Sequence, residues 1–200
     1  MIRKHEKAFE QFPPSCLRPK YKNDPNPQYD HLVDVVGGRG GTVMDIGCAS
    51  CIMYPLLKDK VEHYIGVDII QKFLDHAKTL YPEIEVKQGS LLDIPFPDNS
   101  FDTVFCKSVL LHLDPKDVPQ AIHEMMRVAS KQTVIGFRVL PGKRETVTKS
   151  EEFFYVNFRK QDILDAIESH SKFKNLDILP GGWYRGSQTG IYLITLKNGI

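Results

Sequence analysis

Two acidic residues beside short apolar runs have the spacing expected of a binding site. Asp45 stands in the run Thr42–Ile46, just before Gly47, and Asp68 ends the next apolar run, 23 positions later. A strand that stops at a glycine and turns into a helix brings backbone N–H groups to the edge of a pocket. A carboxylate about 20 residues beyond such a turn is well placed to accept hydrogen bonds from both hydroxyls of a ribose. The spacing therefore predicts a nucleoside-binding site.

The elements that must position these residues alternate between strand and helix. Apolar and β-branched runs predict strands, and apolar residues at helical spacing predict the helices between them. The predicted strands are 42–46, 63–68, 84–87, 101–107, 132–140, 174–179 and 191–197. The last two are joined by Pro180-Gly181-Gly182, which favours an antiparallel hairpin. We expect a doubly wound α/β sheet of seven strands, mostly parallel, with that hairpin at its C-terminal end.

Size and composition indicate one ordinary globular domain over residues 1–200. The chain is 42% hydrophobic and 26% charged with a net charge of +1, so no overall field attracts nucleic acid or an anionic membrane. No apolar run reaches the roughly 20 residues that span a bilayer, and the first residues lack the apolar core of a signal peptide. Four cysteines without a paired pattern favour a reducing, cytoplasmic setting.

Residues 1–28 form a predicted N-terminal arm ahead of a core at 29–200. Six Lys or Arg and two Glu occur among residues 1–22, and prolines at 13, 14, 25 and 27 prevent a long helix. One interpretation is a solvated arm packed loosely on the domain. The other is a lid over a cofactor or a polar substrate.

Four segments together resemble one family, the class I S-adenosylmethionine-dependent methyltransferases. V-M-D-I-G-C-A-S-C at 43–51 resembles the family's first motif, which usually reads D-x-G-x-G-x-G after a strand, and Y-I-G-V-D at 64–68 is similar to its second strand. G-S-L-L-D-I-P-F-P-D-N-S-F-D at 89–102 is the most specific match and resembles a small-molecule subgroup of methyltransferase type 11. V-F-C-K-S-V-L-L-H-L at 104–113 resembles the fourth strand and its loop. The resemblance implies a Rossmann-like sheet.

The resemblance also implies roles for the matching residues. Asp45 would orient the glycine loop or hold the cofactor ammonium through water, while Asp68 would accept both ribose hydroxyls. Backbone groups of the loop would contact the methionine part, the residues after the second and third strands would contact the adenine, and two carbonyls after the fourth strand would contact the ammonium. The implied S-adenosylmethionine site comprises Asp45, Gly47, Cys48, Ala49, Asp68, Ile69, Ser90, Leu91, Cys106 and Lys107.

The first motif departs from the family pattern at Ala49 and Cys51, where glycines are usual. Alanine is a mild change if its backbone φ is negative. Cys48-x-x-Cys51 is also the spacing of a redox pair or half a metal site, but buried structural thiols are the favoured interpretation. We predict no metal.

Other residues are candidates for the acceptor side. His112 follows the fourth strand and is either a general base or a residue that packs the next loop. Arg138, a charge amid apolar neighbours, either pairs with an acid or faces an anionic substrate. Aromatic residues in predicted loops either shape a substrate pocket or cap the sheet. The substrate candidates are Arg138, Tyr155, Trp183, Tyr184 and Arg185.

Three functions follow, in order of preference. The first is a methyltransferase with a small-molecule acceptor. The second is an RNA or protein methyltransferase that uses the basic arm, and the third is a non-catalytic nucleoside-binding or partner-binding domain, suggested by Ala49 and Cys51. A dinucleotide dehydrogenase is disfavoured because G-x-A-x-x replaces G-x-G-x-x-G. The sequence does not indicate the acceptor or the oligomeric state.

Overall fold

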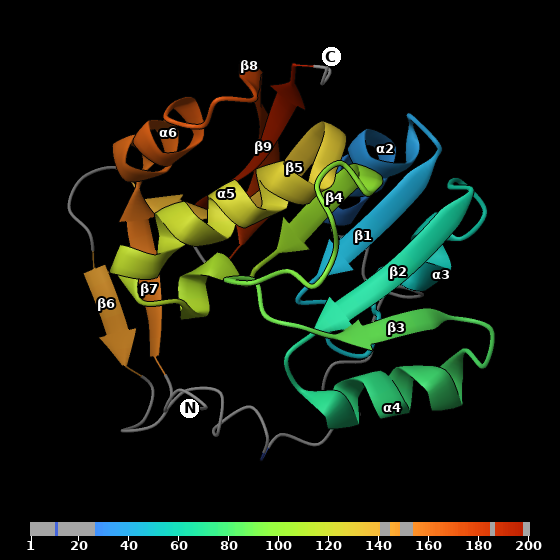
Figure 1. Cartoon of the computed structure of the whole chain (residues 1–200). Helices are drawn as coiled ribbons and strands as arrows, with labels where there is room; N and C mark the ends of the chain where they lie inside the picture. The colour runs from blue at the N-terminus through green and yellow to red at the C-terminus, as the bar shows by residue number, and fades with distance from the viewer. Residues whose placement is uncertain (1–10, 12–26, 141–144, 149–153, 185–186, 198–200) are drawn as a thin grey trace.

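A mostly parallel sheet forms the centre of the computed structural model, which describes residue 11 and residues 27–140, 145–148, 154–184 and 187–197. Seven strands correspond to the predicted ones: β1 (Thr42–Ile46), β2 (His63–Asp68), β3 (Glu85–Gln88), β4 (Phe101–Lys107), β5 (Ala129–Leu140), β8 (Phe173–Tyr184) and β9 (Ser187–Leu196). Strands β3, β2, β1, β4 and β5 lie side by side in parallel, and β9 is antiparallel to both β5 and β8 (Figure 1). The predicted fold class is confirmed.

The first strand along the chain, β1, lies in the interior of the sheet, between β2 and β4. From β1 the chain moves outward through β2 to β3, then returns to place β4 on the other side of β1. The strand order therefore reverses between β1 and β4, and the loops that leave their carboxyl ends diverge to opposite faces of the sheet. Such a switch point is where open α/β sheets bind ligands.

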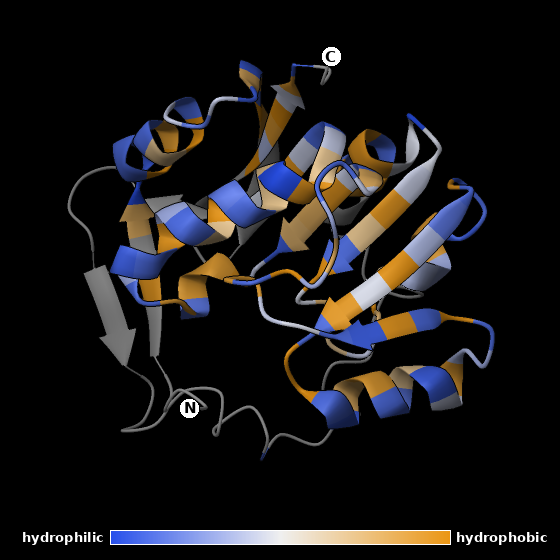
Figure 2. Cartoon of the chain, viewed as in Figure 1, coloured by the Kyte–Doolittle hydropathy of each residue, from blue (hydrophilic) through white to orange (hydrophobic). Residues whose placement is uncertain are grey.

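Helices cover both faces of the sheet (Figure 1). Buried residues of α2 (Pro27–Gly37), α3 (Tyr54–Leu57) and α4 (Gln71–Leu80) belong to one core cluster, and those of α5 (Val118–Val128) and α6 (Lys160–Glu168) to another. Both α4 and α5 contain hydrophobic and hydrophilic residues (Figure 2), and the buried ones recur at the three- and four-residue spacing of an amphipathic helix. Two short 3₁₀ helices, η2 (Leu110–His112) and η3 (Pro115–Asp117), follow β4. No helix in the described part of the chain is long and apolar enough to cross a membrane.

Two regions differ from the sequence predictions. Residues expected to be a loose stretch form a hairpin of β6 (Glu145–Thr148) and β7 (Phe154–Arg159), and β7 extends the sheet beside Val139 and Leu140 of β5. Strand β8 does not end before Pro180 but continues to Tyr184, with an irregularity between Pro180 and Trp183. Proline is tolerated there because β8 pairs with β9 alone and needs no second set of N–H donors. Tyr155, Trp183 and Tyr184 therefore lie in strands, not in the loops that the sequence predicted.

The predicted arm lies largely outside the described residues. Only Gln11, Pro27 and Gln28 of residues 1–28 are described, and the last two begin α2. Whether the arm acts as a lid stays a prediction.

Candidate functional site

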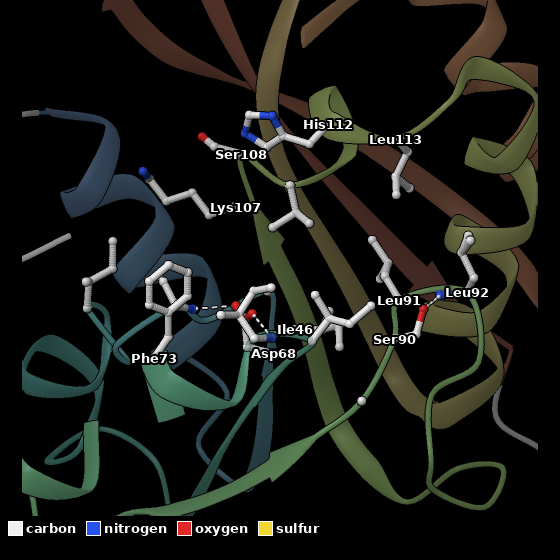
Figure 3. A pocket seen from close by; sticks show the side chains of 17 residues that line it. Ile46, Asp68, Phe73, Ser90, Leu91, Leu92, Lys107, Ser108, His112 and Leu113 are labelled. Carbon is white, nitrogen blue, oxygen red and sulfur yellow. Dashed lines mark hydrogen bonds between the residues drawn. The ribbon is translucent and has the colours of Figure 1, made fainter. Parts of the chain in front are cut away.

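A cavity of about 340 Å³ lies at the carboxyl ends of β1, β2, β3 and β4 (Figure 3). Its walls come from the segments that follow these four strands, at residues 46–52, 68–73, 89–92 and 107–113. The cavity thus lies where the strand order reverses. It brings together eight predicted site residues: Gly47, Ala49, Asp68, Ile69, Ser90, Leu91, Lys107 and His112.

The loop after β1 is built from residues with left-handed backbone. Gly47 has φ +78°, and a Cβ there would come within 2.2 Å of Val109 Cγ2, so this position needs glycine for both conformation and space. Ala49 and Cys51 have φ +51° and +53°. The condition under which alanine would be mild, a negative φ, is therefore not met. The left-handed backbone of each of these two residues costs roughly 1 kcal/mol or more of folding free energy.

Asp68 ties this loop to the start of α4. Its Oδ2 accepts a hydrogen bond from the backbone N–H of Ala49 at 2.8 Å, and its Oδ1 accepts one from Ile70 at 2.9 Å (Figure 3). Burial raises the pKa of Asp68, while these N–H groups act to lower it. Each carboxylate oxygen has a second lone pair, so the side chain still has acceptor capacity for a ligand in the cavity.

Asp45 lies behind the cavity wall, on β1. The Tyr64 hydroxyl donates a hydrogen bond to its Oδ2 at 2.6 Å. Burial raises the pKa of Asp45 to about 7, the Tyr64 hydrogen bond and Lys107 act to lower it, and Asp68 adds to the increase. The loop after β1 donates the Ala49 N–H to Asp68 and not to Asp45. Asp45 instead accepts its side-chain hydrogen bond from Tyr64 on β2.

The two thiols of the loop pack together against β2. Cys48 and Cys51 have their sulfur atoms 3.5 Å apart, and a Cβ on Gly66 would come within 2.4 Å of Cys51 Sγ. Burial raises the pKa of Cys48 and also that of Cys106, to about 12, so these thiols are protonated at neutral pH. This environment favours the structural interpretation of the thiols. No group of three or more His, Cys, Asp or Glu side chains among the described residues could hold a metal ion.

Apolar side chains form the rest of the wall between Asp68 and the segment after β3. Ile69 is 37% exposed, whereas Phe73 and Leu91 are buried. Nine lining residues were not predicted from the sequence: Ile46, Ile52, Ile70, Phe73, Gly89, Leu92, Ser108, Val109 and Leu113. Most follow a predicted strand within a few residues, a position that points to the sheet edge, and Phe73 lies on the apolar face of the helix that follows.

The segment after β3 is held from outside the cavity by α5. Glu124 accepts a hydrogen bond from the N–H of Ile94, and Arg127 donates to the carbonyls of Ile94 and Phe96. Arg127 also forms ion pairs with Glu124 at 2.7 Å and Asp98 at 2.9 Å. This clamp was not predicted from the sequence, although the i, i+3 spacing of an acid and an arginine on a predicted helix is a usable signal.

Polar residues after β4 gather at the other end of the cavity. Figure 3 shows the His112 ring and the Ser108 hydroxyl close together there, with Lys107 beside them and Asp68 at the opposite end. Ser108 is another left-handed residue, with φ +58°, and its N–H donates to the Gly136 carbonyl at 2.8 Å. Backbone strain at an exposed cavity residue is typical of functional sites.

The backbone alone places most of the predicted substrate residues. Arg138 on β5 is paired with Thr189, Tyr155 on β7 with Val147, and Trp183 and Tyr184 at the end of β8 with Gln188 and Ser187. Arg185 lies outside the described residues. Their roles toward a substrate stay predictions.

Comparison with known proteins agrees with this geometry. A family model described as a methyltransferase domain matches residues 44–137. A probable S-adenosylmethionine-dependent methyltransferase of Mycolicibacterium smegmatis is 31% identical over 100 residues, which are 50% of this chain and 37% of that protein. The chain thus spans well under half the length of this relative.

Solved structures share the fold at lower identity. A protein of Pyrococcus horikoshii superposes with a TM-score of 0.75 and 18% identity, covering 96% of this chain and 99% of that one. The magnesium protoporphyrin IX methyltransferase of Synechocystis, solved with bound S-adenosylhomocysteine, has a TM-score of 0.67 and 16% identity, covering 86% of this chain and 83% of its own. Residues 44–137 of this chain therefore match a methyltransferase domain, and the chain has the fold that these solved structures share.

Proposed function

We propose that this chain transfers the methyl group of S-adenosylmethionine to a small-molecule acceptor. The observation that carries the proposal is the cavity at the β1–β4 switch point, with the Asp68 carboxylate at one end and His112 at the other. The methyltransferase domain supplies the reaction class. A small acceptor is supported by the structural similarity to the magnesium protoporphyrin IX methyltransferase of Synechocystis.

The cavity has the chemistry that a nucleoside cofactor needs. Its volume of about 340 Å³ falls in the usual range for small-molecule sites. Asp68 retains lone pairs for the ribose hydroxyls, and Ile69, Phe73 and Leu91 offer apolar surface for an adenine. Gly89, at the cavity wall, packs closely against Pro95, since a Cβ there would come within 2.7 Å of it. The residues present thus fit the cofactor.

Each lining segment has a proposed binding role. Asp68 accepts the ribose hydroxyls, Ile69 and Leu91 flank the adenine, and Ser90 meets its edge. Backbone groups of Gly47, Cys48 and Ala49 contact the methionine part. The carbonyls of Cys106 and Lys107 would hold the ammonium, and the Asp45 carboxylate would reach it through water.

Methyl transfer requires little from the protein beyond alignment of the two reactants. When bound, the cofactor supplies a sulfonium methyl group that is already electrophilic. The apolar walls would exclude water and help to orient the acceptor. His112 accepts a proton from an acceptor that binds in its protonated form. Arg138, Tyr155, Trp183, Tyr184 and Arg185 are proposed to shape the acceptor side.

Calorimetry with S-adenosylmethionine and S-adenosylhomocysteine tests the proposal. Asp68→Ala removes an acceptor of two charge-assisted hydrogen bonds, so we expect binding to weaken at least tenfold. Asp75→Ala, on the exposed face of α4, is the matched control and should bind as the unchanged protein does. Because Asp68 also holds Ala49, urea unfolding of both variants separates lost binding from lost structure. No binding of either compound by the unchanged protein would contradict the proposal.

The other two functions are distinct outcomes of further measurements. Salt-dependent RNA retention that is lost when residues 1–22 are removed would favour a macromolecular acceptor. Binding of both compounds without methyl transfer to any acceptor would favour a non-catalytic domain. In a catalytic protein that needs a base, His112→Ala should lower the turnover rate while leaving cofactor affinity within about twofold.

A further inference from the structure

Tyr64, on β2, is a buried tyrosine whose hydroxyl reaches a site residue. The side chain is 6% exposed and lies among apolar residues that include Val43, Leu74 and Phe105. Phenylalanine would fill the same space, so packing does not require the hydroxyl. A buried hydroxyl needs a hydrogen-bond partner, and this one donates to Asp45 Oδ2.

The bond between Tyr64 and Asp45 has the geometry of a charge-assisted hydrogen bond. Its O···O distance is 2.6 Å, in the range typical of a hydroxyl that donates to an ionised carboxylate. The strand register places Tyr64 opposite Val43 and Gly66 opposite Asp45, so the tyrosine reaches the carboxylate diagonally across the strand pair. Burial and Asp45 itself raise the pKa of Tyr64 well above its usual value, so the hydroxyl stays a donor.

Several other groups face Asp45 from the elements around it. Asp68 at the end of β2 disfavours its charge, and Lys107 at the end of β4 favours it. The thiols of Cys48 and Cys106 are protonated and carry no charge. Among the described residues, the Tyr64 hydroxyl opposes the effect of burial more strongly than Lys107 does.

We propose that Tyr64 is a positioning residue that holds Asp45 in the ionised form needed to bind the ammonium group of the cofactor. This inference rests on the proposed function, because it assumes that the cavity binds S-adenosylmethionine. Tyr64 lies behind the wall and acts only through Asp45. Neither the nucleoside part of the ligand nor its apolar surroundings should depend on the tyrosine hydroxyl.

The inference predicts a specific pH dependence of ligand affinity. Burial raises the pKa of Asp45 to about 7, so binding of a ligand with an ammonium group should strengthen as the pH rises through 7. Without the Tyr64 hydroxyl the pKa rises further, and the same strengthening occurs at higher pH. A ligand without an ammonium group should show neither effect.

The experiment measures two ligands by calorimetry at two pH values. S-adenosylhomocysteine carries the ammonium, and 5′-methylthioadenosine has the same nucleoside and thioether without it. For Tyr64→Phe we expect affinity for S-adenosylhomocysteine to fall about fivefold at pH 7 and no more than about twofold at pH 8, where the amino group of the ligand is still protonated. Affinity for 5′-methylthioadenosine should stay within about twofold of the unchanged protein at both pH values.

A second variant keeps the test decisive if Tyr64→Phe folds poorly. Asp45→Asn can still accept the tyrosine hydrogen bond but has no charge, so it should bind S-adenosylhomocysteine with equal affinity at pH 7 and pH 8. The inference is overturned if Tyr64→Phe weakens both ligands, weakens S-adenosylhomocysteine equally at both pH values, or has no effect. If the unchanged protein binds neither ligand, the proposed function itself fails.

Discussion

The two walls of the cavity are held in opposite ways. The inner loop, residues 47–51, is held from within the site, because Asp68 receives the N–H of Ala49 while facing the cavity. The other wall, residues 89–92, continues into an outer segment, residues 92–98, which is held from behind by side chains of α5 that do not line the cavity. A ligand that binds Asp68 therefore affects the hydrogen bond that holds the inner loop. The contacts that hold the outer segment do not face the cavity and should not change when a ligand binds.

The acidic side chains of the two regions also differ in the direction in which their pKa values are shifted. Burial raises the pKa of both carboxylates beside the inner loop, Asp45 and Asp68. The pKa of Glu124, behind the outer segment, is lowered chiefly by its hydrogen bonds with Arg127. The inner carboxylates are thus costly to ionise without a partner, and a cationic ligand would supply one. The outer pair is already satisfied.

The largest expected effect comes from breaking the contacts that hold the outer segment. Arg127→Met removes two carbonyl contacts and two ion pairs, and leaves Glu124, whose side chain is 19% exposed, without its partner. We expect urea unfolding to show a loss of about 3 kcal/mol in the free energy of unfolding. Arg127→Lys keeps the charge but not the planar fork of donors, and should lose about half as much. Equal stability of all three proteins would show that α5 does not hold this segment.

A side chain added at Gly66, on β2, should displace the inner loop. A Cβ at this position would come within 2.4 Å of Cys51 Sγ and 2.9 Å of Cys48 Sγ, so the loop must move in Gly66→Ala. We expect a loss of about 2 kcal/mol in the free energy of unfolding, together with weaker ligand binding. Adding Cys51→Gly removes the nearer sulfur and should restore part of both losses in a double-mutant cycle. Additive losses in the double variant would show that the thiol is not the obstacle.

The pH dependence of stability should distinguish the two walls. The pKa of Asp45 is raised from 3.8 to about 7 in the folded protein, so its contribution to stability is complete below pH 4 and is lost as the pH rises through 7. Asp45→Asn should therefore gain between about 1 and 2 kcal/mol over the unchanged protein at pH 8, with no gain at pH 4.

Glu124→Gln is the matched comparison for that measurement. The lowered pKa of Glu124 means that its contribution is complete above pH 4.5 and is lost as the pH falls further. Glu124→Gln should be less stable than the unchanged protein at pH 7, and the difference should shrink toward pH 3. Parallel stability curves for Asp45→Asn and the unchanged protein between pH 4 and 8 would contradict the assignment for Asp45.

The sheet and the position of the cavity were predictable because they depend on local patterns. Strands such as β1 and β4 are short apolar runs with clear ends, and parallel strands in this order bring those ends to one edge. The hairpin β6–β7 was not predictable, since four- and six-residue strands with mixed composition resemble loops. The α5 clamp was also missed, because Arg127 and Ile94 are 33 residues apart and no local pattern links them.

The inner loop shows a different limit. The sequence identified Ala49 and Cys51 as departures from glycine, but a backbone angle is not written in residue types. Only the coordinates show that both residues have positive φ and that Asp68 receives the N–H of Ala49. Alanine and cysteine at these two positions therefore affect the stability of the loop. The two positions should respond differently to replacement by glycine.

The smallest expected effect is a gain at Ala49. Its φ of +51° disfavours any Cβ, and Ala49→Gly keeps the N–H that Asp68 binds, so we expect the free energy of unfolding to rise by about 1 kcal/mol. Cys51→Gly relieves a similar angle but removes a side chain that is fully buried against Gly66, so it should lose about 1 kcal/mol instead. Urea unfolding of the two variants measures both signs. If Ala49→Gly is also destabilised, packing of the Ala49 methyl group outweighs its backbone strain, and the inner loop is held by side chains on both sides of Ser50.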